Sequence, residues 1–200
     1  MFKGVKDRGE EALSPLSILN EIDIFKSFTD EIKQNMSQKM RQHLYQPDDI
    51  IIQQGDQGDS LFIIVEGSVS VRIRIDGKQV EVDRMGASSF FGEMALLTGE
   101  PRNASIIAIT NCLLYEITQC DIAPLFNQYP EITEILCNEL TRRTVNRQKK
   151  KDEYNLEKID KEALSKTFFS RITTYFGLGK NGQKIENVCV DNDLDINVET

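Results

Sequence analysis

Hydrophobic spacing divides the chain into a helical start, a β-rich middle and a helical end. Between residues 16 and 45 apolar side chains recur at helical spacing, and Thr29 followed by two acidic residues is typical of a helix N-terminus. We therefore predict helix over 16–45, ended by Pro47. From residue 49 to about 117, short apolar runs alternate with turn residues, which indicates strands.

The clearest strand covers residues 68–75, where apolar and polar residues alternate. We expect its valines and isoleucines to be buried and its serines and arginines to face water. Asp76-Gly77 predicts a hairpin to a return strand that contains Val80 and Val82. Two more strands are expected near 104–109 and 112–117. Many short strands joined by tight turns predict a sandwich or roll rather than a parallel α/β sheet.

Helical patterns return after Thr118, which forms a capping-box pattern with Asp121. A second helix is expected after Pro130, with an apolar stripe that ends near Val145. The predicted organisation is then an N-terminal tail (1–15), a main domain (16–150), a partly amphipathic helical extension (151–180) and an acidic tail expected to be disordered (181–200).

Residues 164–178 contain a second amphipathic pattern. Its apolar residues share one helical face: Leu164, Phe168, Phe169, Ile172, Tyr175 and Phe176. This face can pack on its own domain, on the second copy in a homodimer, or on a partner. A weak contact with a membrane surface through 164–178 is a further alternative.

Composition narrows the function classes. The 200 residues carry a net charge of −8, which disfavours DNA as a partner because binding phosphates requires a basic surface. A single histidine and four scattered cysteines offer no pattern of metal ligands and little scope for histidine-based catalysis. No run approaches the roughly 20 apolar residues of a membrane span, and no secretory signal is visible. We expect a cytoplasmic protein with no catalytic and no metal site.

The segment 90–105 interrupts the strand pattern and carries the candidate chemistry. Gly92 lets the backbone approach a ligand, and the helical turn that follows offers N–H groups to an anion. Arg102 adds a planar cation suited to two phosphate oxygens, and Ser105 adds a hydroxyl. A carboxylate at Glu93 fits such a site if it accepts a hydrogen bond from a sugar hydroxyl. The segment therefore predicts a ribose-phosphate pocket.

Two of these side chains have alternative roles. Arg102 can instead form a surface ion pair with Glu100, and Glu93 can be an ordinary residue of a first helical turn.

Segment 90–105 resembles the phosphate-binding cassette of cyclic-nucleotide-binding domains, a family found in catabolite activator protein, protein kinase A regulatory subunits and cyclic-nucleotide-gated channels. The turns at 58–62 and 65–67 are similar too, and the resemblance extends over roughly 18–145. It is most like the domains of bacterial cyclic-nucleotide-regulated channels. It implies a mostly β fold with flanking helices: a double-stranded β-helix, or jelly-roll-like β-roll, with N-terminal helices and C-terminal lid helices.

The resemblance also implies roles for single residues. Arg102 would bind the cyclic phosphate, Glu93 would bind the ribose 2′-hydroxyl, and Asp59 would orient Arg102. The other cassette positions would complete the site: Gly92, Met94, Ala95, Asn103, Ala104 and Ser105. Many cGMP-preferring members carry threonine where this chain has Asn103. The predicted ligand is therefore cAMP, with cGMP as the alternative.

In this family the C-terminal helices close over the roll and cap the base. The hinge would lie at 118–130 and the lid would begin at residue 131, with Arg142 or Arg143 contacting the base; a solvated basic helix face is the alternative for both. The movement would act on an effector protein or a fused membrane channel. The competing functions are a transcription regulator of the catabolite-activator type and an interaction scaffold with a vestigial pocket. Residues 151–200 are too short and too acidic for the DNA-binding motif that the regulator needs.

Overall fold

The computed structural model describes residues 14–151 and 160–178, with the backbone alone over 146–151. Its helices are α1 (Pro15–Glu21), α2 (Asp23–Lys26), α3 (Asp30–Ser37), α4 (Glu93–Thr98), α5 (Gln119–Gln128), α6 (Glu131–Lys151) and α7 (Lys161–Tyr175). Its strands are β1 (Arg41–Tyr45), β2 (Ile50–Ile52), β3 (Ser60–Glu66), β4 (Ser68–Ile75), β5 (Lys78–Gly86), β6 (Phe90–Phe91), β7 (Ser105–Ala108) and β8 (Cys112–Thr118).

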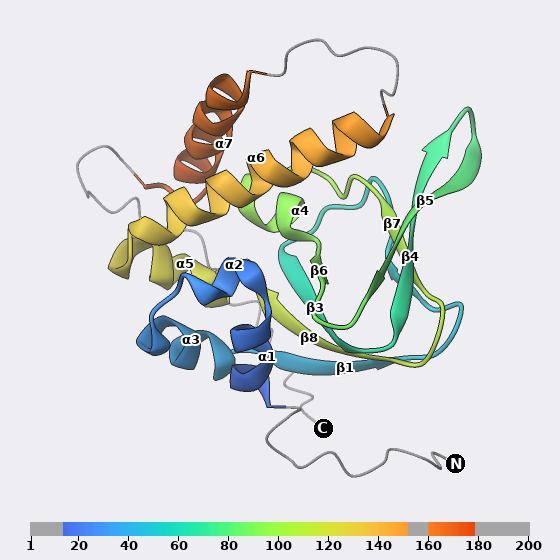
Figure 1. Ribbon diagram of the computed structural model, residues 1–200, viewed down its shortest axis with the longest axis horizontal. Helices are drawn as coiled ribbons and strands as arrows, with labels where there is room; N and C mark the ends of the chain where they lie inside the picture. The colour runs from blue at the N-terminus through green and yellow to red at the C-terminus, as the bar shows by residue number, and fades with distance from the viewer. Residues whose placement is uncertain (1–13, 152–159, 179–200) are drawn as a thin grey trace, which may run out of the picture.

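The strands form two antiparallel four-stranded sheets, in the orders β1-β8-β3-β6 and β2-β7-β4-β5. Figure 1 shows the strands gathered into a roll, with the N-terminal helices, α5 and α6 on one side of it. The predicted roll with helices at both ends is therefore confirmed.

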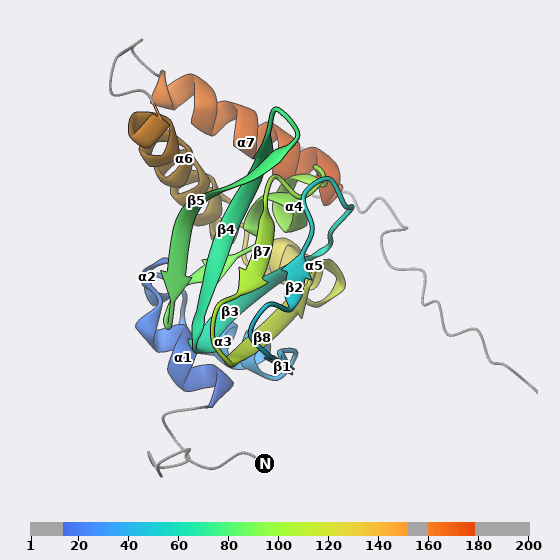
Figure 2. The ribbon, with the colours of Figure 1, turned by 90° about the vertical axis from the view of Figure 1, so that its right-hand side faces the viewer.

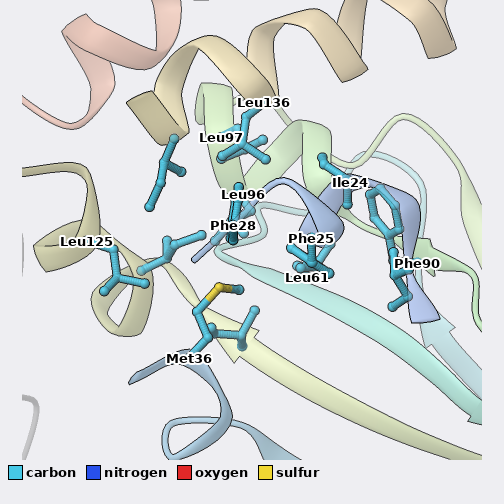
Figure 3. Close-up of a cluster of buried hydrophobic side chains, with 14 of the residues drawn as sticks. Ile24, Phe25, Phe28, Met36, Leu61, Phe90, Leu96, Leu97, Leu125 and Leu136 are labelled. Atoms are coloured by element: carbon cyan, nitrogen blue, oxygen red, sulfur yellow. The ribbon is translucent and has the colours of Figure 1, made fainter. Parts of the chain in front are cut away.

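Strand β3 lies at the centre of the packing because both of its faces are buried. Phe62 and Ile64 point between the two sheets, whereas Leu61, Ile63 and Val65 point toward the helices. On the helical side, Leu61 belongs to one buried cluster with Phe25 of α2, Leu96 and Leu97 of α4 and Leu136 of α6 (Figure 3). One cluster therefore joins the strand to helices from both ends of the chain.

The predicted helix starts near Thr29 and Thr118 are confirmed. The Thr29 hydroxyl accepts a hydrogen bond from the Ile32 N–H, and Thr118 forms a full capping box with Asp121. These caps fix where α3 and α5 begin.

The helix predicted up to residue 45 is wrong over its last part. Helix α3 ends at Ser37, and Arg41–Tyr45 form β1, which pairs with β8. The His43 Nε2 lies 2.8 Å from a carboxylate oxygen of Glu116 on β8. Pairing with a strand about 70 positions away decides the conformation here, and local spacing does not contain that information.

The alternation in β4 also fails at two positions. Ser70, expected in water, is fully buried, because its hydroxyl donates to Glu81 at 2.7 Å and accepts from Arg72 at 3.0 Å. Ile75, expected in the core, is 47% exposed beside the hairpin. The long charged side chains of Glu81 and Arg72 thus cover Ser70.

Helix α7 packs on its own domain, one of the alternatives left open by the sequence. The side chains of Phe168, Ile172 and Phe176 are buried in the same cluster as the N-terminal helices. Phe169, expected on the same face, is 49% exposed, so that assignment is wrong. The predicted tail at 181–200 lies outside the described residues. In the described part of the chain, no helix is both long enough and apolar enough to cross a bilayer.

Candidate ligand-binding site

A cavity of about 770 Å³ lies between the sheet β2-β7-β4-β5, the segment around α4 and the C-terminal helices. Its volume is within the range typical of small-molecule sites. Aliphatic side chains of β4 and β5 form one wall, among them Val71, Ile73, Val82 and Met85. The predicted cassette forms the opposite wall. The cavity therefore has an apolar side and a polar side.

Arg102 is the buried cation of the polar wall, with 7% of its surface exposed. Its Nη1 donates to the carbonyl oxygens of Ser60 at 2.7 Å and Gly92 at 2.9 Å, and its Nη2 donates to the Ser60 hydroxyl at 3.0 Å. A guanidinium has five N–H donors, and these bonds use three of them. The alternative pairing with Glu100 is not formed, because Glu100 pairs with Arg171.

Two glycines make room for this guanidinium. Gly92 has φ +87°, and a Cβ there would lie 2.7 Å from Arg102 Nη1 and 2.8 Å from the Ser60 carbonyl oxygen. A Cβ on Gly58 would overlap the guanidinium itself. The space that holds Arg102 is therefore closed to any larger residue at either position.

The electrostatic setting keeps Arg102 charged. Burial lowers the pKa of its guanidinium, and the negative charges of Asp59, Glu116 and Glu93 act against that shift. Since the ordinary pKa of an arginine side chain lies far above neutral pH, Arg102 remains a cation there. The cavity thus contains a fixed positive charge.

Glu93, the first residue of α4, is 4% exposed and lies beside Arg143 of α6. The Arg143 Nη1 is 3.4 Å from a Glu93 carboxylate oxygen and 3.1 Å from the Phe90 carbonyl oxygen. Its guanidinium carbon also stacks 3.5 Å from the centre of the Phe90 ring. Arg143 therefore ties α6 to the beginning of the cassette, and Glu93 is held at the cavity wall.

The neighbouring arginines of α6 provide a direct test of this tie. Replacing Arg143 by alanine is expected to lower the free energy of unfolding by about 1–3 kcal/mol, because a partly buried charged hydrogen bond and a stacking contact are lost. Arg142→Ala should change it by less than about 0.5 kcal/mol, because that side chain is 61% exposed and pairs only with Glu139 among the described residues. Urea titration of both variants measures the difference. Equal free energies of unfolding for the two variants would show that the contacts of Arg143 do not stabilise the packing of α6 on the cassette.

The structure brings most of the predicted site residues together. Those lining the cavity are Gly92, Glu93, Met94, Ala95, Arg102, Asn103, Ala104 and Arg143. Three others lie outside the lining. Asp59 is exposed and acts on Arg102 through its charge, Arg142 points to solvent, and the Ser105 hydroxyl accepts a hydrogen bond from the Gln54 N–H at 3.0 Å.

Sequence reasoning missed four groups that shape the site. Gly58 makes space for Arg102, Ser60 positions it, and Phe90 holds Arg143. Helix α7 contributes a further wall through residues such as Thr167 and Arg171. The 58–62 turn was noted as a pattern, but nothing in it indicated which side chain it would accommodate.

This arrangement is that of a ligand-binding β-roll with a buried arginine in its pocket. Residues 42–129 match the family model of the cyclic nucleotide-binding domain. The chain therefore contains a cyclic nucleotide-binding domain, as the resemblance of the cassette predicts.

Relatives of this domain belong to different signalling proteins. The type II regulatory subunit of cAMP-dependent protein kinase from Drosophila melanogaster is 36% identical over 91 residues, covering 46% of this chain and 24% of the relative. A cyclic nucleotide-gated potassium channel from Mesorhizobium japonicum is 43% identical over 86 residues, covering 43% of this chain and 22% of the relative. The chain thus spans about a quarter of the length of these curated relatives.

The regulatory domain of Toxoplasma gondii protein kinase A, solved with cAMP, has the same fold. Its TM-score is 0.59 at 21% identity, and the match covers 82% of this chain and 59% of that one. The fold that the two proteins share therefore extends well beyond residues 42–129, the segment matched by the family model.

Proposed function

We propose that this domain binds cAMP and acts as a regulatory sensor rather than an enzyme. The observation that carries the proposal is the position of Arg102, a buried cation that lines the cavity and is held in place by hydrogen bonds to Ser60 and Gly92. A guanidinium in this setting suits the two exocyclic oxygens of a cyclic phosphate.

The other roles follow the shape of the cavity. Glu93 accepts a hydrogen bond from the ribose 2′-hydroxyl, and the neighbouring Arg143 holds its carboxylate at the cavity wall. Gly92, Met94, Ala95 and Ala104 form the cradle around the phosphate and sugar. The aliphatic side chains of β4 and β5 then provide an apolar surface for the purine.

The base preference rests on Asn103. This residue lines the cavity directly after Arg102, where many cGMP-preferring relatives carry threonine. We therefore propose cAMP as the preferred ligand, with cGMP as the weaker one.

The output of the sensor is movement of the C-terminal helices. Arg143 links the proposed sugar-binding carboxylate to α6, so a change at Glu93 reaches this helix directly. A channel or transporter that is fused to the domain or associated with it is the proposed effector, since a relative at 43% identity is a cyclic nucleotide-gated channel.

The function is tested by calorimetric titration of cAMP and then cGMP into the purified chain. The expected result is micromolar or tighter binding of cAMP and weaker binding of cGMP. If cGMP binds more tightly, the base preference is wrong while the sensor proposal stands. If neither binds, the sensor proposal fails and an interaction scaffold with a vestigial pocket becomes the better hypothesis.

A further inference from the structure

Cys120 differs from the other cysteines of the described residues because its thiol is not free. It is the second residue of α5, it is exposed, and it forms a disulfide bond. Cys112 and Cys137 are free and buried. Since the 200 residues contain four cysteines, Cys189 is the one left within the chain to pair with Cys120, and it lies outside the described residues.

The two buried thiols are poor targets for an oxidant. Burial raises the pKa of the Cys137 thiol to about 11, so this thiol keeps its proton at neutral pH. The Cys112 thiol donates to the Ser68 carbonyl oxygen at 3.3 Å and belongs to the apolar cluster between the two sheets. Cys120 is exposed instead, so an oxidant in solution can reach it.

The C-terminal end of α7 lies beside Cys120. The Tyr175 hydroxyl donates at 3.1 Å to the side-chain oxygen of Gln119, the residue before Cys120. The Phe176 ring centre is 4.4 Å from that of Phe126, also on α5. Figure 2 shows α7 running across the end of the roll and ending on the side where α5 lies. The chain therefore leaves α7 next to the helix that carries Cys120.

The position of Cys189 in the sequence fits this geometry. Cys189 comes eleven residues after Leu178, the last described residue. Eleven extended residues span up to about 36 Å, far more than the side chains that join α7 to α5. A connection of this length gives two thiols an effective concentration in roughly the millimolar range. Pairing within one chain is therefore favoured over pairing between chains at micromolar protein.

We propose that Cys120 and Cys189 are a reversible redox pair, which attaches the acidic segment after α7 to α5 when it is oxidised. With oxidised glutathione as the oxidant, the Cys120 thiolate attacks one glutathione sulfur and releases the first glutathione. The Cys189 thiolate then displaces the second, and the two thiol protons pass to the released glutathiones. One protein disulfide forms while one oxidised glutathione becomes two reduced ones. Reduced glutathione reverses both steps and releases the segment.

The proposed pair is separate from the nucleotide site. Neither Gln119 nor Cys120 lines the cavity, and the exchange of thiols needs no ligand. The pair is therefore tested independently of cAMP binding. Oxidation would hold the segment 181–200, with five acidic residues and one lysine, beside α5. In a reducing compartment, a disulfide of this kind is typical of a redox sensor rather than of a structural crosslink.

The experiment equilibrates the full chain in glutathione buffers of increasing oxidised fraction, alkylates the remaining thiols after denaturation and cleaves the chain after glutamate. This cleavage places each cysteine on a peptide of its own: 101–116, 117–131, 135–139 and 187–199. Mass spectrometry should find 117–131 linked to 187–199, with separation on reduction. The link should be absent in Cys189→Ser and unchanged in the matched control Cys112→Ala.

A second pair of variants tests the contacts that bring the end of α7 to α5. Phe176→Ala removes the ring that packs on Phe126, so it should lower the effective concentration of the two thiols about three- to tenfold. Phe169→Ala is the control, because Phe169 is half exposed and belongs to neither buried cluster. The glutathione ratio at which half of the protein is linked measures the effect.

The proposed pair is disproved if oxidised glutathione produces no link between 117–131 and 187–199, or produces it only in disulfide-joined dimers. A link that persists in a hundredfold excess of reduced glutathione would be a permanent crosslink, and reversibility would be disproved. If Phe176→Ala and Phe169→Ala need the same glutathione ratio, the contacts of α7 do not bring the thiols together. Each of these results stands whether or not the chain binds cAMP.

Discussion

Replacing Arg102 by alanine is expected to weaken cAMP binding about 30- to 800-fold, which corresponds to about 2–4 kcal/mol for a lost contact between buried charges. The guanidinium is the buried cation of the polar cavity wall, and its hydrogen bonds to Ser60 and Gly92 hold it in place. Calorimetric titration of cAMP into the variant measures the effect.

Two further variants show whether the loss of cAMP affinity arises from the binding site itself. Arg102→Lys keeps the charge but not the planar pair of donors, so its affinity should lie between those of the wild type and the alanine variant. Arg84→Ala removes an equal charge from an exposed β5 side chain that does not line the cavity, and should leave affinity within twofold. Thermal unfolding confirms that each variant is folded. A folded Arg102→Ala protein with wild-type affinity would refute the assignment of Arg102 to the phosphate.

Gly92→Ala is expected to lower the free energy of unfolding by about 2–4 kcal/mol and to reduce cAMP affinity at least tenfold. Alanine at φ +87° is strained, and its Cβ would crowd both Arg102 and the Ser60 carbonyl oxygen. Relief of that crowding requires the guanidinium to move. Urea unfolding and cAMP titration measure the two effects separately.

The matched control is Gly77→Ala in the β4–β5 hairpin. Gly77 has φ +77°, close to that of Gly92, but no atom lies within 4 Å of the position of its Cβ. This variant should therefore show only the strain, about 1–2 kcal/mol, with cAMP affinity unchanged. If both variants lose the same stability and neither loses affinity, close packing at Gly92 has no role in the site.

The sequence was most informative where the site is local. Gly92, Glu93 and Arg102 lie within eleven consecutive positions, so their chemistry could be recognised as one motif, and the structure places all three on one cavity. Hairpins and helix caps are local in the same sense, and the predictions at Asp76-Gly77 and Thr118 were confirmed.

Contacts between distant positions were not predictable in this way. Arg171 lies in the predicted amphipathic segment 164–178 but is not part of its apolar face, and only the packing of α7 brings it to Glu100, 71 positions away. Arg142 and Arg143 were equivalent candidates by sequence. A turn of 100° per residue along α6 separates their side chains, and only Arg143 reaches the cavity. Strand β1 was missed because its partner is β8.

The burial of β3 on both faces has a consequence for how a ligand would be bound. Ser60, the first residue of this strand, supplies both a carbonyl and a hydroxyl acceptor to Arg102. Ordering a long side chain on association usually costs about 0.5–1.5 kcal/mol of conformational entropy. Here the arginine is ordered when the roll folds, so an arriving anion meets a preorganised partner. The stability of the fold and the affinity of the pocket then depend on the same hydrogen bonds.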